Sequence, residues 1–438
     1  MNLPVRGTRR AASGLRRTLR SRRTQLILFL GILGPGLITS NADNDAGGIA
    51  TYSQAGAQFG YKMLWLLLLI TISLVVTNEM GARMGVITGK GLADLIRERF
   101  GVRGTTFAML LLMVANAFTT VAEFAGIAAA MELYGVSKYI SVPVMAVVIW
   151  LLVVRGSYPV VEKVLLAIGL MYITYVVSGL LVHPSWGDVL RGSVDVPHDV
   201  VVSNAYFLLA IALIGTTVTP WMQFYLQAAV AEKGIPNEQL AYSRVDVIVG
   251  AFVTDFIAFF IVIATAATLY GHLSPAQLSN LQAGDYAKAL GPVVGNAAKL
   301  LFGAGLFGAS VLAGSVVPLS TSYAVTEAFG WERGVGNRFS EAPAFFAIFT
   351  GLIAFGAAVV LIPGVPLVGV ILASQDVNGL ILPVVLVYML VLLNDRRVMG
   401  RYVNGPVANA IGGSTVALLV LLTALLLVSA IPGSPLAG

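Results

Sequence analysis

The 438-residue sequence is too apolar for a water-soluble protein, with 57% hydrophobic and only 11% charged residues. Soluble domains carry about 45–50% apolar and about 25% charged residues, so much of this chain must face lipid. The absence of Cys excludes disulfides, thiolate metal sites and cysteine nucleophiles. The net charge of +6 does not indicate a nucleic-acid partner, because the basic residues are distributed between apolar segments.

The first 24 residues are strongly basic, with arginines recurring from Arg6 to Arg23 directly before the first apolar run. Such a cluster can imitate the start of a signal peptide. The apolar run that follows is interrupted by Asp43 and Asp45 and lacks a convincing small-residue cleavage site. We therefore interpret residues 1–24 as a retained cytoplasmic tail.

Eleven segments are apolar and long enough to cross a membrane, which takes about 20 residues. They lie at about 25–53, 62–79, 106–133, 139–154, 164–183, 204–231, 247–270, 293–327, 343–362, 367–393 and 406–431. Residues 25–203 contain the first five spans and an external loop, residues 204–393 the next five, and residues 394–438 the last span and an external C-terminus.

Most of the 27 basic residues fall in the tail and in alternate connections between the spans. The positive-inside rule assigns such connections to the cytoplasm. The sequence therefore predicts a multi-pass protein of the cell inner (plasma) membrane, with its N-terminus cytoplasmic and its C-terminus external. We expect a monomer whose surroundings are the lipid bilayer.

The densest polar cluster lies in the first span, in the segment GPGLITSNADNDAGGIAT. Ionisable groups at membrane depth are costly and mark functional sites. The cluster Asp43, Asn44 and Asp45, followed by Gly47 and Gly48 as bends, argues against a continuous helix. A broken helix exposes carbonyl oxygens that can bind a cation. The alternative is a plain loop between two helices, with Asp45 as the N-cap of the second.

A second interruption lies in the sixth span, at Pro220. Proline removes a backbone donor and disrupts the helix before it, which frees carbonyls such as that of Thr216. The alternative is an ordinary proline kink, patched by hydroxyl groups such as that of Thr219. Because the two breaks begin corresponding halves of the chain, they indicate an inverted-repeat transporter with a binding site near the middle of the membrane.

Three further polar residues lie within predicted spans. Gln375 in the tenth span could reach an ion or could form hydrogen bonds between helices. Glu123 in the third span is better explained by packing or gating than as a ligand. Asp255 in the seventh span could line a polar passage or pair with another helix.

Several motifs resemble the Nramp (natural resistance-associated macrophage protein) family of divalent metal transporters. The DAGG that begins at Asp45 resembles the family's DPGN, and RMGVITGKGLADL resembles LGIVTGKDLAEL. The AE that ends at Glu123 resembles the family's DLAE, and the SQ that ends at Gln375 its tenth-span SQ. The resemblance implies an all-α membrane protein with the leucine-transporter-like fold, in which helices 1–5 and 6–10 are inverted repeats and helices 1 and 6 are broken.

The departures from the family pattern concern the ion. The sixth-span MPH reads Thr219-Pro220-Trp221 here, and Thr120 replaces the third-span aspartate. A thioether favours softer transition metals, whereas oxygen ligands favour hard ions such as Mg²⁺. A proton relay needs groups that titrate. The chain thus resembles the Nramp-related magnesium-transporter branch, and we expect transport without proton coupling.

These observations predict a transporter that takes up divalent metal ions, Mg²⁺ foremost and also Mn²⁺, by alternating access. It is not an enzyme, and we expect no cofactor. The candidate metal ligands are Asp43, Asn44, Asp45, Thr216, Thr219 and Gln375, and the candidate gating or pathway residues are Glu123, Trp221 and Asp255. Two alternatives remain: a proton-coupled manganese or iron transporter, and a carrier of organic substrates such as amino acids.

Overall fold

The computed structural model describes residues 36, 39, 42–155, 173–197, 203–278, 281–289 and 297–429. These residues form helices and turns, with no strand in this part of the chain. Nine stretches of them are long and apolar enough to cross a membrane. The predicted tail 1–24 and parts of the first and fifth spans lie outside the described residues, so the count of eleven spans stays a prediction.

The helices follow the apolar segments in chain order. The first half of the chain forms α3 (Ala46–Phe59), η1 (Gly60–Met63), α4 (Leu64–Thr88), α5 (Leu92–Leu133), α6 (Lys138–Arg155), α8 (Ile173–Leu181) and α9 (Trp186–Val194). The second half forms α10 (Asn204–Thr217), α11 (Pro220–Lys233), η3 (Asn237–Gln239), α12 (Leu240–Leu269), α13 (Pro275–Leu278), α14 (Ala283–Ala289), α16 (Ala297–Phe329), α17 (Pro343–Leu361), α18 (Leu367–Asn394), α19 (Arg396–Met399), η4 (Gly400–Tyr402) and α20 (Pro406–Ser429).

Two helices are longer than their apolar runs. The α4 helix continues to Thr88 and ends at Gly89, whose left-handed backbone (φ 63°) is the usual helix stop. The α5 helix begins in the polar segment before the predicted span and kinks at Gly101 (φ 67°). The predicted external loops 184–203 and 271–291 contain the short helices α9, α13 and α14. Hydropathy locates the membrane-embedded part of a helix, not its polar ends.

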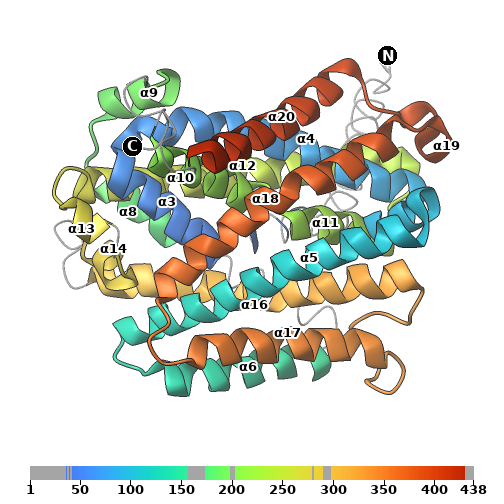
Figure 1. Ribbon diagram of the computed structural model, residues 1–438, viewed down its shortest axis with the longest axis horizontal. Helices are drawn as coiled ribbons and strands as arrows, with labels where there is room; N and C mark the ends of the chain where they lie inside the picture. Colours follow the sequence, from blue (N-terminus) through green and yellow to red (C-terminus); the bar gives the residue numbers. More distant parts are fainter. Residues whose placement is uncertain are drawn as a thin grey trace, which may run out of the picture.

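The helices form two groups (Figure 1). The α5, α6, α16 and α17 helices pack on one another along the lower edge of the view. The α3, α4, α10, α12 and α20 helices lie above them, and α18 contacts both groups. The helices α9, α13 and α14 lie at one end of the molecule and α19 at the other.

The end that contains α19 is rich in arginine, and we call it the basic face. It comprises residues 89–103, the segment 330–342 and residues 395–402. Ion pairs join these segments, with Arg99 Nε lying 2.9 Å from Asp395 Oδ2 and Arg333 near Asp94. This is the face that the distribution of basic residues predicts to be cytoplasmic.

The closest helix packing near the breaks joins α10 to α18. A Cβ atom built on Gly215 would overlap the backbone nitrogen of Gly379 and lie 2.5 Å from the carbonyl oxygen of Gln375. A Cβ atom built on Gly379 would lie 2.7 Å from Ile211. Small residues allow membrane helices to approach this closely. The pair fixes the end of α10 against the middle of α18.

We predict that Gly215→Ala destabilises the protein by about 1–3 kcal/mol, because the methyl group meets backbone atoms that cannot rotate away. The measurement is thermal unfolding in detergent. The matched control is Gly351→Ala on α17, where nothing lies within 4 Å of the added carbon. That variant should unfold at the same or a higher temperature, since alanine favours a helix. Equal unfolding temperatures for the two variants would contradict the close packing.

Candidate functional site

The first helix break lies at Asn44 and Asp45. Residues 42 and 43 are helical, the next two are not, and α3 begins at Ala46. Asp45 is the N-cap of α3, as the loop alternative predicted, because its Oδ1 accepts a hydrogen bond of 2.6 Å from Gly48 N. Its Oδ2 accepts no hydrogen bond and is buried. Asp45 therefore caps a helix and still has one carboxylate oxygen for a ligand.

Gly47 and Gly48 lie in the first turn of α3 rather than at the bend. They were expected to provide the bends, but their surroundings are crowded. A Cβ atom on Gly47 would overlap the side-chain amide of Gln375, and one on Gly48 would lie 3.2 Å from the Asp43 carbonyl oxygen. Gly47 therefore permits close approach of α18, whereas Gly48 packs against the break itself and against Tyr52.

The second break lies at Val218 and Thr219, as predicted. Val218 (φ −119°, ψ 80°) and Thr219 (φ −79°, ψ 146°) are extended, and Pro220 is the first residue of α11. Proline is favoured there because the first helical N–H has no partner within the helix. In a continuous helix the Thr216 carbonyl would accept a hydrogen bond from residue 220. Proline has no N–H, so this oxygen is free of the helix.

The two breaks lie side by side. The Tyr52 hydroxyl on α3 lies 2.9 Å from Thr217 Oγ1 on α10. Thr217 already donates to the Leu213 carbonyl, so Tyr52 is the donor to Thr217. Gln375 lies between the halves, with its side chain against Gly47 and its backbone oxygen near Gly215. Three segments distant in the sequence therefore meet at one point.

The Gln375 side chain is held in place by its own helix and by α5. Its Nε2 donates to Ser374 Oγ at 2.8 Å, and its Oε1 accepts from Asn378 Nδ2 at 3.2 Å. Asn378 Nδ2 also donates to Thr119 Oγ1 at 3.0 Å. An amide oxygen accepts two hydrogen bonds or ligand contacts, so Oε1 has capacity for one more.

Four buried carboxyl groups surround the first break. Asp45 and Glu123 are in direct contact, and Glu123 Oε2 also accepts a hydrogen bond of 3.2 Å from Ala46 N. Asp43 is within electrostatic reach of Asp45 and of Asp255 on α12. Neither oxygen of Asp43 or of Asp255 accepts a hydrogen bond. Glu123 thus contacts the candidate ligand Asp45, and its expected role in packing or gating stays a prediction.

Buried like charges destabilise one another unless a cation or a proton compensates them. The cluster does not form a chelating set on its own. Among the described residues, no three His, Asp or Glu side chains are arranged to hold a metal ion. A metal ion here would therefore need carbonyl, amide or hydroxyl oxygens in addition to carboxylates.

The remaining candidates lie on the two sides of the breaks. Asn44 Nδ2 donates to the Thr254 carbonyl at 3.1 Å, which turns this side chain toward α12, and its Oδ1 has no hydrogen-bond partner. The Thr216 and Thr219 hydroxyls are fully buried and have none either. Gln375 lies against Gly47, two residues after Asp45. No hydrogen bond ties either threonine hydroxyl to Asp45 or to Gln375.

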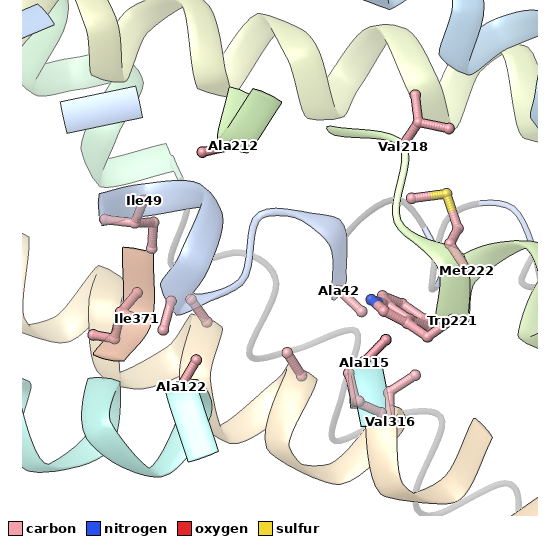
Figure 2. Packing of buried hydrophobic residues seen from close by; sticks show 14 of the residues in the cluster. Ala42, Ile49, Ala115, Ala122, Ala212, Val218, Trp221, Met222, Val316 and Ile371 are labelled. Atoms are coloured by element: carbon pink, nitrogen blue, oxygen red, sulfur yellow. The ribbon is translucent and has the colours of Figure 1, made fainter. Parts of the chain in front are cut away.

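Trp221 fills the space where α11 begins. The indole is fully buried, and its Nε1 has no hydrogen-bond partner. Figure 2 shows it pointing toward Ala42, beside the first break, and toward Ala115 and Val316. The Met222 side chain extends toward Val218 instead. An apolar ring thus occupies one side of the break region.

The sequence did not indicate the role of Tyr52 or the Gly215–Gly379 contact. Tyr52 lies in an apolar segment, and its hydrogen bond depends on Thr217, which is distant in the sequence. Asn378 lies three residues after Gln375, one helical turn away, so the sequence does place it beside that candidate ligand. A glycine on each of two spans is too common in membrane helices to identify a contact.

Two helix breaks side by side within apolar segments, with unpaired buried oxygens at both breaks, are the arrangement of a membrane transporter. Backbone of this kind is tolerated in lipid only where it lines a protein-enclosed site.

Comparison with known proteins agrees with this class. A family model described as natural resistance-associated macrophage protein-like matches residues 36–429. The divalent metal cation transporter MntH of Aeromonas hydrophila is 30% identical over 421 residues, which cover 92% of this chain and 96% of that protein. MntH of Deinococcus radiodurans is 30% identical over 434 residues, covering 95% and 94%.

Solved structures share the fold. The Eremococcus coleocola manganese transporter, in complex with an aromatic bis-isothiourea substituted compound, matches with a TM-score of 0.73 at 20% identity, covering 90% of this chain and 85% of that one. MhsT in complex with L-phenylalanine matches with a TM-score of 0.56 at 14% identity, covering 91% and 98%. The chain belongs to the Nramp family, and it is a transporter rather than an enzyme.

We predict that the Tyr52–Thr217 hydrogen bond contributes about 1 kcal/mol to stability, because both side chains are fully buried. A double-mutant cycle with Tyr52→Phe and Thr217→Val, read as the free energy of unfolding in detergent, measures it. The double variant should be less destabilised than the sum of the single variants. Additive effects would show that the two halves are not joined at this point.

Proposed function

We propose that this protein mediates uptake of divalent metal ions, with Mg²⁺ as the main substrate and Mn²⁺ as a competitor. The ion binds between the two helix breaks and is exposed alternately to either side of the membrane. The observation that carries the proposal is the excess of buried oxygen atoms without hydrogen-bond partners at these breaks, in Asp43, Asn44, Asp45, Thr216 and Thr219.

The composition of the site favours a hard ion. In this assignment Asp45 Oδ2 is the main anionic ligand, and the carbonyl of Thr216, Thr219 Oγ1 and Gln375 Oε1 complete the shell directly or through water. Mg²⁺ binds through one or two carboxylates and retains several waters. Thr219 stands where the family pattern has a methionine, so the thioether that would favour softer metals is replaced by a hydroxyl.

The membrane potential is a sufficient driving force. With the basic face in the cytoplasm, an inward-negative potential acts on both charges of the ion, or about 4.6 kcal/mol per 100 mV. Trp221 and Thr120 stand where the family pattern has titratable groups. We therefore propose uptake across the inner membrane, by a monomer, without proton coupling.

A proton-coupled manganese transporter is the second candidate. Two observations favour it: the relatives named above are divalent metal cation and manganese transporters, and Glu123 remains as a buried carboxyl beside Asp45. An amino acid carrier is disfavoured by the start of α3. The Ala46 and Gly48 N–H groups that would bind a substrate carboxylate already donate to Glu123 and Asp45.

The proposal is tested in proteoliposomes by Mg²⁺ and Mn²⁺ flux with a simultaneous readout of lumenal pH. We expect Mg²⁺ entry that increases with an inside-negative potential and leaves lumenal pH unchanged, and competition by Mn²⁺. Acidification that accompanies metal entry would favour the proton-coupled candidate. Failure of the purified protein to transport Mg²⁺ at all would refute the assignment of substrate.

We predict that Asp45→Ala abolishes Mg²⁺ binding and flux. Asp45→Asn should do the same while it keeps an oxygen that caps α3, so its unfolding temperature should stay closer to that of the unsubstituted protein. Asp188→Asn, which removes a charge from the exposed helix α9, is the control and should transport normally. Normal Mg²⁺ flux in Asp45→Asn would show that this carboxylate is not the anionic ligand.

We predict that Thr219→Met shifts selectivity toward Mn²⁺, because a thioether sulfur prefers the softer ion. The measurement is the ratio of Mn²⁺ to Mg²⁺ transport under competition. Thr219→Leu adds comparable bulk without sulfur and should lower both fluxes without changing their ratio. Identical ratios of Mn²⁺ to Mg²⁺ transport in the two variants would show that Thr219 does not contact the ion.

A further inference from the structure

A basic pocket lies where α18 ends on the basic face. It is a shallow, open depression of about 670 Å³, lined by Arg99, Leu390, Val391, Asn394, Asp395, Arg396 and Arg397. Three arginines and one aspartate give the lining a net positive charge. Neither the ion site nor any step proposed above uses this pocket.

Asp395 is the one acidic residue that lines the pocket, and both of its carboxylate oxygens already have partners. Asp395 Oδ2 pairs with Arg99 at 2.9 Å, and Asp395 Oδ1 accepts a hydrogen bond of 2.9 Å from Arg397 N as the cap of α19. Within the described part of the chain, no carboxylate pairs with the exposed guanidinium groups of Arg396 and Arg397. Among the described residues, the guanidinium groups of Arg396 and Arg397 therefore have no carboxylate partner in the pocket.

An apolar groove continues from the pocket toward the middle of the membrane. It encloses about 400 Å³ between α5, α18 and α20 and is lined by Phe100, Pro383, Val384, Val387, Tyr388, Val416 and Val420. The two cavities lie next to each other along α5 and α18. Arg99 and Phe100 are consecutive on α5, and on α18 the groove residue Val387 lies about one turn before the pocket residue Val391. At 1.5 Å per residue, the distance from Pro383 to Asp395 is about 18 Å.

Specific contacts between α5 and α18 form the wall of this groove. The Phe100 and Tyr388 rings pack edge to face with centroids 4.8 Å apart, and Tyr388 OH donates to the Gly104 carbonyl at 3.2 Å. The kink at Gly101 turns α5 immediately after Phe100. These contacts fix the separation of α5 and α18 next to the groove.

We propose that the pocket and groove together bind one anionic phospholipid from the leaflet at the basic face. Its phosphate pairs with Arg396 and Arg397, since guanidinium groups bind phosphate oxygens in bidentate fashion. One acyl chain lies along the groove against Val384 and Val387. Basic pockets between membrane helices on the cytoplasmic side suit anionic lipid head groups. A free phosphate would occupy the pocket, but it has no acyl chain to lie in the groove.

The test uses the full-length protein in detergent, with lipid retention measured by native mass spectrometry. We expect phosphatidylglycerol to remain bound and phosphatidylcholine to dissociate. The Arg396→Gln/Arg397→Gln double variant should bind phosphatidylglycerol at least about tenfold more weakly. The control is Arg338→Gln/Arg401→Gln, which removes the same charge from the basic face outside the pocket and should bind normally. Equal loss in both double variants would overturn the proposal in favour of a general surface charge effect.

The groove is tested separately by Val387→Trp, which fills it at a half-exposed position. This variant should lose phosphatidylglycerol and yet fold, as shown by an unchanged gel-filtration profile. Competition with inorganic phosphate distinguishes a phospholipid head group from free phosphate as the bound ligand. If inorganic phosphate displaces the lipid at comparable concentrations, or if Val387→Trp retains the lipid fully, the site is an anion pocket and not a lipid site.

Discussion

The structure depends on how the two broken helices satisfy their backbone donors. In lipid, every N–H and C=O needs a partner from the protein. At the first break Glu123 accepts from Ala46 N and Asp45 accepts from Gly48 N. At the second break Pro220 has no N–H to satisfy. These backbone donors are thus removed or paired, while the carboxylate oxygens of Asp43 and one of Asp45 remain without a hydrogen bond inside an apolar bundle.

The breaks could be predicted from the sequence because the residues that cause them lie next to one another in the chain. Clustered carboxylates and carboxamides in one span, and a proline in the other, are local features with local consequences. The helix boundaries were less accurate, because α4 and α5 continue into polar segments whose ends depend on Gly89 and the kink at Gly101. All six candidate ligands are buried in the structure, as a site in the membrane interior requires.

The arrangement around the ligands could not be predicted. Tyr52 and Thr217 are 165 residues apart in the sequence, and only the packing of α3 on α10 makes them partners. The same holds for Gln375, which touches Gly47 and Gly215 only because three helices cross at one point. Gly47 and Gly48 were expected to be bends, yet both lie in the first turn of α3, and Gly47 is the one that faces α18. Tertiary contacts assign such roles, and composition alone does not reveal them.

The attachments of the sixth span have a mechanical consequence. Its first half, α10, is locked to α18 through Gly215 and Gly379, while its second half, α11, is tied to α16, because Ser320 donates to the Trp221 carbonyl. The two halves therefore have different attachments. Any rotation of one half relative to the other would be absorbed by the dihedral angles of Val218 and Thr219, which are extended. Under the proposed alternating access, such a rotation would also change the shape of the candidate ion site.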